Sequence, residues 1–180
     1  MERPRCSVFI ATSADGYIAR RDGAIDWLER VQGPDYGYAA FLASVDTLVM
    51  GRATYDTVLG FGDWPFAGKR VIVMTHRPAA PRRDETFASA TPIELLAQLG
   101  NAQRIYVDGG NVIRQFLSAH LIDDVTLSIV PIVLGDGVRL FVGGEGEHAL
   151  ALESSQAWPT GLVQLRYRVS SVRASSATSR

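Results

Sequence analysis

A Gly-Gly pair between an apolar run and a helical pattern is the strongest candidate for a ligand site. Residues 104–117 read RIYVDGGNVIRQFL, so a short β-type segment enters Gly109 and Gly110 and a helical pattern follows at once. Because glycine lacks a Cβ atom, a phosphate group can approach the backbone there and meet the free N–H groups and positive dipole end of the helix. The pair predicts an anion site, and a simple strand-to-helix turn is the alternative.

Gly51 has a similar position, after an apolar run at residues 47–50 and before a helical pattern. Arg52 offers a charged fork to a phosphate group, and Thr54 offers a hydroxyl where the helix dipole is positive. The alternative is a glycine helix start followed by a solvent-exposed arginine. With a second glycine site in the chain, we favour a phosphate-binding role.

Three aspartates are candidates for acid–base chemistry or substrate binding. Asp15 also suits an Asp-Gly turn, Asp26 can cap the segment that follows it, and Asp108 can cap the helix after the Gly-Gly pair. The three histidines share no metal-ligand spacing, and Cys6 is the only cysteine, so no metal site or intrachain disulfide is predicted.

Composition sets the frame for these residues. The 180 residues are 47% hydrophobic and 21% charged, which fits one domain at residues 1–172 followed by a flexible tail at 173–180. A net charge of -1 gives no general attraction to nucleic acid or to acidic membranes. No secretory signal and no long apolar segment is present, so a cytoplasmic protein is expected.

The elements that must position the candidate residues alternate between strand and helix. Apolar strand patterns are predicted at 5–12, 47–50, 70–75, 86–88 and 105–108, and helices at 34–44, after Gly51, at 92–99 and after Gly110. The last third contains extended segments at 124–133, 139–142, 149–156 and 162–172. The pattern predicts an α/β fold with a mixed, mainly parallel sheet flanked by helices and an antiparallel C-terminal portion.

Six motifs in order resemble those of one superfamily: SADGYIA, IDWL, VMGRATY, VIVMTHR, YVDGG and SIVPIVLGDGVRLF. They are similar to those of the dihydrofolate reductase-like superfamily, and the resemblance covers roughly residues 5 to 170. The nearest likeness is to the reductase domain of the bifunctional riboflavin-biosynthesis deaminase-reductase and its stand-alone relatives. The resemblance implies a dihydrofolate reductase-like fold and NADPH-dependent hydride transfer.

The resemblance also implies which residues bind the cofactor, NADPH. Arg77 would hold the 2′-phosphate that distinguishes NADPH from NADH, with a solvent-exposed arginine as the alternative. In the superfamily the Gly-Gly peptide bond can be cis. The complete implied set is Ile18, Gly51, Arg52, Ala53, Thr54, Thr75, His76, Arg77, Gly109, Gly110, Asn111 and Val112.

The substrate side of the resemblance contains a departure. Trp27 resembles the tryptophan of folate reductases, which carry an essential acid five or six positions later, where this chain has Gln32 and Gly33. Asp35 would supply the missing acid if the loop is longer than in the folate reductases. Asp108 stands where the riboflavin-pathway reductases commonly carry an acid. The candidate catalytic or substrate residues are Asp15, Asp26, Trp27 and Asp108.

The resemblance implies a small heterocyclic or ribosyl substrate, first of all 5-amino-6-(5-phosphoribosylamino)uracil. Another small substrate of a dihydrofolate reductase-like enzyme and a non-catalytic NADPH-binding protein are the alternatives. The apolar C-terminal strands, together with the likeness, predict a homodimer.

Overall fold

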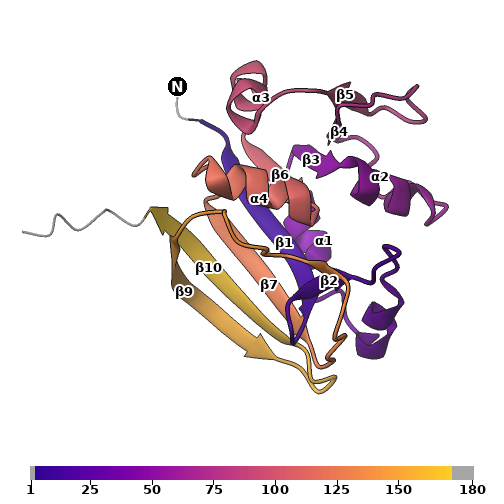
Figure 1. The fold of residues 1–180 in the computed structure, drawn as a ribbon, viewed down its shortest axis with the longest axis vertical. Coiled ribbons are helices and arrows are strands. Elements are labelled where there is room, and N and C mark those ends of the chain that lie inside the picture. Colours follow the sequence, from indigo (N-terminus) through magenta and orange to yellow (C-terminus); the bar gives the residue numbers. More distant parts are fainter. Residues whose placement is uncertain (1–2, 172–180) are drawn as a thin grey trace, which may run out of the picture.

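An eight-stranded mixed sheet runs through the molecule, with the strands in the order β5-β4-β3-β6-β1-β7-β10-β9 (Figure 1). The computed structural model describes residues 3–171. The strands of this sheet are β1 (Arg5–Ser13), β3 (Thr47–Gly51), β4 (Arg70–Met74), β5 (Thr86–Ala88), β6 (Arg104–Asp108), β7 (Asp124–Val130), β9 (His148–Ala157) and β10 (Val163–Ser171). A separate two-stranded sheet pairs β2 (Tyr17–Ala19) with β8 (Val138–Arg139).

The first six strands of that order are parallel, and β10 runs antiparallel to both β7 and β9. The helical elements are η1 (Asp26–Val31), α1 (Tyr38–Ala43), α2 (Arg52–Leu59), α3 (Pro92–Gln98) and α4 (Gly110–Ser118). The predicted α/β fold, with a mainly parallel sheet and an antiparallel C-terminal portion, is therefore confirmed.

Two apolar clusters lie on opposite sides of the sheet because successive strand residues point to opposite faces. One cluster contains Val49 and Ile105 with residues of α3 and α4, including Phe116. The other contains Leu48 and Tyr106 with residues of α1 and α2. Helices on both faces explain why the parallel strands are continuous apolar runs in the sequence.

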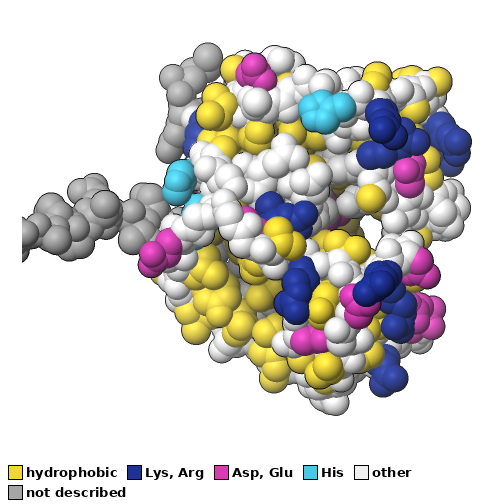
Figure 2. All heavy atoms as spheres, viewed as in Figure 1, with side chains coloured by type: hydrophobic (Ala, Val, Ile, Leu, Met, Phe, Trp, Pro, Cys, Tyr) yellow, Lys and Arg dark blue, Asp and Glu magenta, His cyan; other side chains and the backbone are white. Residues whose placement is uncertain are grey.

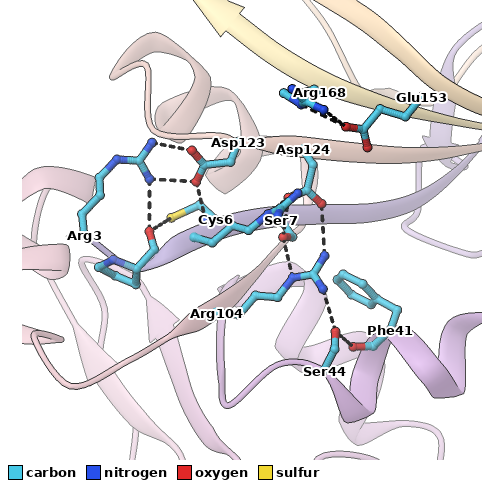
Figure 3. Close-up of polar contacts among 12 residues, drawn as sticks. Arg3, Cys6, Ser7, Phe41, Ser44, Arg104, Asp123, Asp124, Glu153 and Arg168 are labelled. Atoms are coloured by element: carbon cyan, nitrogen blue, oxygen red, sulfur yellow. Dashed lines mark hydrogen bonds and ion pairs between the residues drawn. The ribbon is translucent and has the colours of Figure 1, made fainter.

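A charged network ties together the strand ends that lie far from the Gly-Gly pair (Figure 3). The Asp124 carboxylate accepts hydrogen bonds from Arg5 Nε at 2.6 Å, Ser7 Oγ at 2.9 Å and Arg104 Nη2 at 3.2 Å. These residues belong to β7, β1 and β6. Because Ser7 is fully buried, this network satisfies polar groups that burial would otherwise leave unpaired.

The helix predicted at residues 34–44 is shorter than expected and begins at Tyr38. Tyr36 and Gly37 have φ angles of 53° and 83°, which are incompatible with a continuous α-helix. The Asp35 carboxylate accepts hydrogen bonds from the N–H groups of Gly37 and Ala39, at 3.0 and 2.8 Å. Asp35 therefore forms the turn that precedes the helix.

Two details of the predicted C-terminal third are wrong. The segment at 124–133 belongs to the parallel part, because α4 carries the chain back and β7 lies parallel beside β1. The segment at 139–142 forms strand only at Val138–Arg139, in the small second sheet. The tail predicted at 173–180 lies outside the described residues. Within residues 3–171, no helix has the length and apolarity needed to cross a membrane.

Candidate active site

A cavity of about 1050 Å³ lies where the parallel strands end and α2 and α4 begin. In Figure 2 the surface is hollowed on the right, between α2 and the segment that leads into η1. The predicted cofactor residues that line this cavity are Ile18, Gly51, Arg52, Ala53, Thr54, Thr75, His76, Gly109, Gly110, Asn111 and Val112. The fold thus brings together residues that are up to 94 positions apart, from Ile18 to Val112.

Both helices that start at the cavity lack a side-chain cap. Gly51 and Gly109 occupy the N-cap positions of α2 and α4, and neither helix start has a side-chain hydrogen bond to its first N–H groups. By contrast, Thr91 and Glu94 form a complete capping box at the start of α3. The first turns of α2 and α4 therefore keep N–H donors and positive dipole ends for an anionic ligand.

The Gly-Gly pair is packed too closely for larger residues. Gly109 has a φ angle of +86°, and a Cβ atom there would overlap the Thr54 hydroxyl. A Cβ atom on Gly110 would lie 2.9 Å from Ile18 Cδ1. The described backbone contains no cis peptide bond, so the Gly-Gly bond, for which the resemblance also allows the cis form, is trans.

Asp108 ends β6 on the floor of the cavity. Its Oδ1 accepts a hydrogen bond from the Gly109 N–H at 2.8 Å. Burial nevertheless raises the pKa of the Asp108 carboxyl from 3.8 to about 6. Burial and the nearby Asp108 charge raise the pKa of Tyr38 to about 12. The cavity therefore contains a carboxyl that changes protonation close to neutral pH, next to a neutral phenol.

The two arginines that the resemblance assigns to the cofactor differ in their position relative to the cavity. Arg52 lines the cavity, whereas Arg77 does not. The Arg52 Nε donates to both oxygens of Asp56 at 2.9 Å, and Nη1 donates to the Arg77 carbonyl at 3.4 Å. His76 lines the cavity and its Nδ1 lies 2.8 Å from Ser89 Oγ. Arg77 thus contacts Arg52 through its carbonyl group and is not part of the lining.

Asp15 lies outside the cavity lining and joins two loops. Its carboxylate accepts hydrogen bonds from Ser13 Oγ at 2.6 Å, Leu134 N at 3.0 Å and Gly135 N at 2.7 Å. These bonds, with that from Ser13 the strongest, lower the pKa of Asp15 to about 2. Asp15 therefore holds the turn before β2 against the chain that leads to β8.

Asp26 and Trp27 also lie outside the lining. Asp26 forms an exposed ion pair with Arg20 at 2.6 Å, and the hydrogen bond from Arg20 lowers its pKa. Trp27 is 1% exposed and packs with Val31, Val130 and Leu162. Its Nε1 is buried and finds no hydrogen-bond partner within the described residues. The structure therefore leaves Asp26 and Trp27 out of the lining, to which their neighbours Ile25 and Leu28 contribute.

Several lining residues escaped the sequence analysis, and Arg114 is the most informative. Its Nη1 donates to the carbonyls of Arg139 at 3.0 Å and Leu140 at 3.2 Å, so it ties α4 to β8. The spacing could have revealed it, because Arg114 follows Gly110 by four residues and shares its helix face. The aromatic wall of Phe9, Tyr38 and Tyr106 comes from three separate elements, and no sequence motif marks it.

Comparison with known proteins agrees with this fold. The family model described as RibD C-terminal domain matches residues 4–164. The uncharacterized protein YwjB of Bacillus subtilis (strain 168) is 34% identical over 173 residues, covering 93% of this chain and 98% of YwjB. A putative riboflavin biosynthesis protein from Shewanella sp. PV-4 is 36% identical, with a TM-score of 0.86 over 93% of this chain and 99% of that one.

A more distant structure supports the fold alone. The diaminohydroxyphosphoribosylaminopyrimidine deaminase/5-amino-6-(5-phosphoribosylamino)uracil reductase of Thermotoga maritima is 14% identical, with a TM-score of 0.69. The likeness covers 92% of this chain and 56% of that one. The fold is dihydrofolate reductase-like, and the chain belongs to the RibD C-terminal domain family.

Proposed function

We propose that this protein is an NADPH-dependent reductase that delivers hydride to a C=N or C=O group of a small heterocyclic substrate. The observation that carries the proposal is the convergence of two uncapped helix starts, those of α2 and α4, on the cavity that contains Asp108. Membership of the RibD C-terminal domain family supports a reductase of the riboflavin-pathway type.

The residues present fit a dinucleotide. Gly51 and Gly109 line the cavity, and the helix starts behind them offer N–H donors to a pyrophosphate. Thr54 and Asn111 add side-chain hydrogen-bond groups at the same two places. When bound, NADPH supplies the hydride. The protein's contribution is to hold cofactor and substrate in reacting geometry.

Asp108 is the proton donor in this proposal. With a pKa of about 6, its carboxyl is partly protonated near neutral pH and can give a proton to a substrate nitrogen or oxygen as hydride arrives. The Gly109 N–H holds one carboxyl oxygen, Oδ1, in place at the cavity floor. The rate of the chemical step should therefore rise as the pH falls toward 6.

The family offers 5-amino-6-(5-phosphoribosylamino)uracil as the first substrate to test, and another small heterocycle as the alternative. A protein that binds NADPH without reducing anything is the competing function. Bound NADPH that stays reduced with every candidate substrate would favour that competing function.

Cofactor binding can be tested by titrating NADPH and NADH into the protein and following nicotinamide fluorescence. We expect tighter binding of NADPH, and we expect Arg77→Ala to weaken NADPH binding about tenfold while leaving NADH unchanged. Arg70→Ala is the matched control, because Arg70 begins β4 at its other end and bonds to Asn101. Equal binding of both cofactors by the unmodified protein would refute the role of Arg77 at the 2′-phosphate.

We also propose a homodimer through one face of the C-terminal strands. On that face Leu152 pairs across the sheet with Tyr167, and Leu150 pairs with Val169. Leu150 and Leu152 are 46% and 57% exposed, and Figure 2 shows hydrophobic side chains gathered at the lower left, over β9 and β10. Apolar residues that alternate along a strand lie on one face of the sheet, and such a face is normally packed against another layer of protein.

The size of this face can be compared with that of a dimer interface. β9 has 10 residues and lies at the edge of the sheet, with β10 as its one neighbour. Two strands of that length give a footprint of roughly 300 Å². Each partner buries ~800 Å² in a stable dimer, so the proposed interface extends beyond these two strands. Light scattering should give a dimer mass, and Leu150→Glu with Leu152→Glu should give a monomer. A monomeric unmodified protein at working concentration would contradict the proposal.

A further inference from the structure

Charged side chains are distributed unevenly along the cavity. The charged residues of its lining are Arg52, His76, Glu94, Asp108 and Arg114. We call the part bordered by β3, β4, α3 and the start of α4 the cofactor half. The part around Asp108, bordered by Phe9, Leu28, Tyr38 and Phe61, is the substrate half. This division rests on the proposed function.

Both arginines of the lining are held away from the substrate half. Arg52 follows β3, and its guanidinium bonds to Asp56 and to the Arg77 carbonyl, beyond β4. Since β6 and β1 lie on the opposite side of β3 in the sheet, this guanidinium points away from them. The Arg114 guanidinium is bound by two carbonyl oxygens at β8. Neither cation is free to turn toward Asp108 without losing these bonds.

The walls of the substrate half are aromatic and aliphatic. The Phe9 and Tyr38 rings pack edge to face with centroids 5.4 Å apart, and the Tyr38 and Tyr106 centroids are 6.3 Å apart. The Tyr106 hydroxyl donates to the Phe9 carbonyl at 2.9 Å, which fixes its orientation. Phe61 lines the cavity and is 56% exposed, so it lies at the mouth. Such walls favour a flat ring that stacks or packs against them.

We propose that the substrate of this protein is a flat heterocycle without a phosphate group, recognised through its N–H groups by Asp108. A phosphate dianion placed among Phe9, Leu28, Tyr38 and Phe61 would lie in a partly desolvated space in which the charged side chain of that group is the Asp108 carboxyl. Like charges in such a space repel, and a phosphate group there lacks the arginine or lysine partner that normally compensates its desolvation. A neutral ring with N–H donors meets in Asp108 a carboxyl that accepts hydrogen bonds when ionised and gives a proton when protonated. The cavity therefore discriminates against the phosphoribosyl form of a substrate and favours the same ring without phosphate.

The test compares two compounds that differ only in phosphate: 5-amino-6-(5-phosphoribosylamino)uracil and its dephosphorylated ribosyl form. Loss of nicotinamide absorbance gives kcat/KM for each compound, and calorimetry on the protein with oxidised cofactor gives the affinity for each. We expect both quantities to favour the dephosphorylated compound by about tenfold or more. Phe61→Arg should reduce this preference by placing a cation at the mouth, while Phe61→Leu should leave it unchanged.

The outcomes separate the two proposals. Tighter binding or faster reduction of the phosphorylated compound, or binding of neither compound, overturns the inference on the substrate. If NADPH itself does not bind in a titration without substrate, the proposed function is wrong instead. Binding of the dephosphorylated compound supports the substrate class even if its turnover is slow, because affinity is measured separately from chemistry.

Discussion

Replacing Asp108 by Asn should stabilise the protein while removing its activity. The carboxyl has an ordinary pKa of 3.8 and a pKa of about 6 in the folded protein, so ionising it at the cavity floor opposes folding. The difference of about two pH units corresponds to roughly 3 kcal/mol above pH 6. Asn has nearly the same shape, and its side-chain oxygen can still accept the Gly109 N–H bond. The variant should therefore gain up to about 3 kcal/mol in the free energy of unfolding at pH 8.

The sign of the pH dependence makes this prediction specific. Because the folded pKa lies above the unfolded one, the folded state binds more protons between about pH 4 and 6, and the protein loses stability as the pH rises through this window. Urea unfolding at pH 8 and pH 5 should show the advantage of Asp108→Asn falling by about half at the lower pH. Asp26→Asn is the control, and it should be slightly destabilising because Asp26 loses its Arg20 pair. An Asp108→Asn variant that is no more stable than the unmodified protein at pH 8 would refute the account.

Three further predictions concern the surroundings of the cavity. Asp15→Asn should raise KM for NADPH roughly three- to tenfold with a smaller effect on kcat in steady-state assays, since loss of its bonds loosens the loops that lead to β2 and β8. Gly109→Ala should lower the free energy of unfolding by more than about 2 kcal/mol, because its φ is +86° and the new Cβ meets Thr54. Chemical denaturation should show a cost of only about 1 kcal/mol for Gly135→Ala, where φ is +77° and nothing lies within 4 Å of the new Cβ. Cys6 is fully buried and burial raises its pKa to about 12, so a thiol reagent should label it only after denaturation.

The sequence predicts the parallel part of the fold well because local and tertiary preferences agree there. The strand at 86–88 and the Thr91 cap of α3 are found as expected. The prediction fails at residues 34–37, where the pattern is helical but Asp35 and Gly37 form a turn. It also assigns 124–133 to the antiparallel part, because a strand pattern carries no information on the direction of its partner. The direction in which β7 pairs with β1 depends on where α4 returns the chain to the sheet.

More residues can be predicted from the sequence for the part of the cavity that we propose to bind the cofactor than for the part around Asp108. Its glycines and polar residues occur together in short motifs, such as Gly51 to Thr54, and each motif follows a strand. The aromatic wall around Asp108 is formed by elements that are distant in sequence, so no local sequence pattern predicts it. The sequence also does not show in which direction a long side chain points. It therefore cannot decide whether Arg52 or Arg77 reaches the cavity, and their contacts in the structure are needed.

The direction of each pKa shift separates the aspartates that the sequence could not rank. Asp15 and Asp26 have lowered pKa values, because hydrogen bonds and an ion pair favour their charged forms, and such carboxylates stabilise the fold. Asp108 has a raised pKa, because its burial disfavours the charge by more than the hydrogen bonds from Gly109 and Tyr106 favour it. A residue held in a state that opposes folding is more readily explained by chemistry than by structure. Among the three, Asp108 is therefore the residue whose position requires a functional explanation, and it is also the one that faces the cavity.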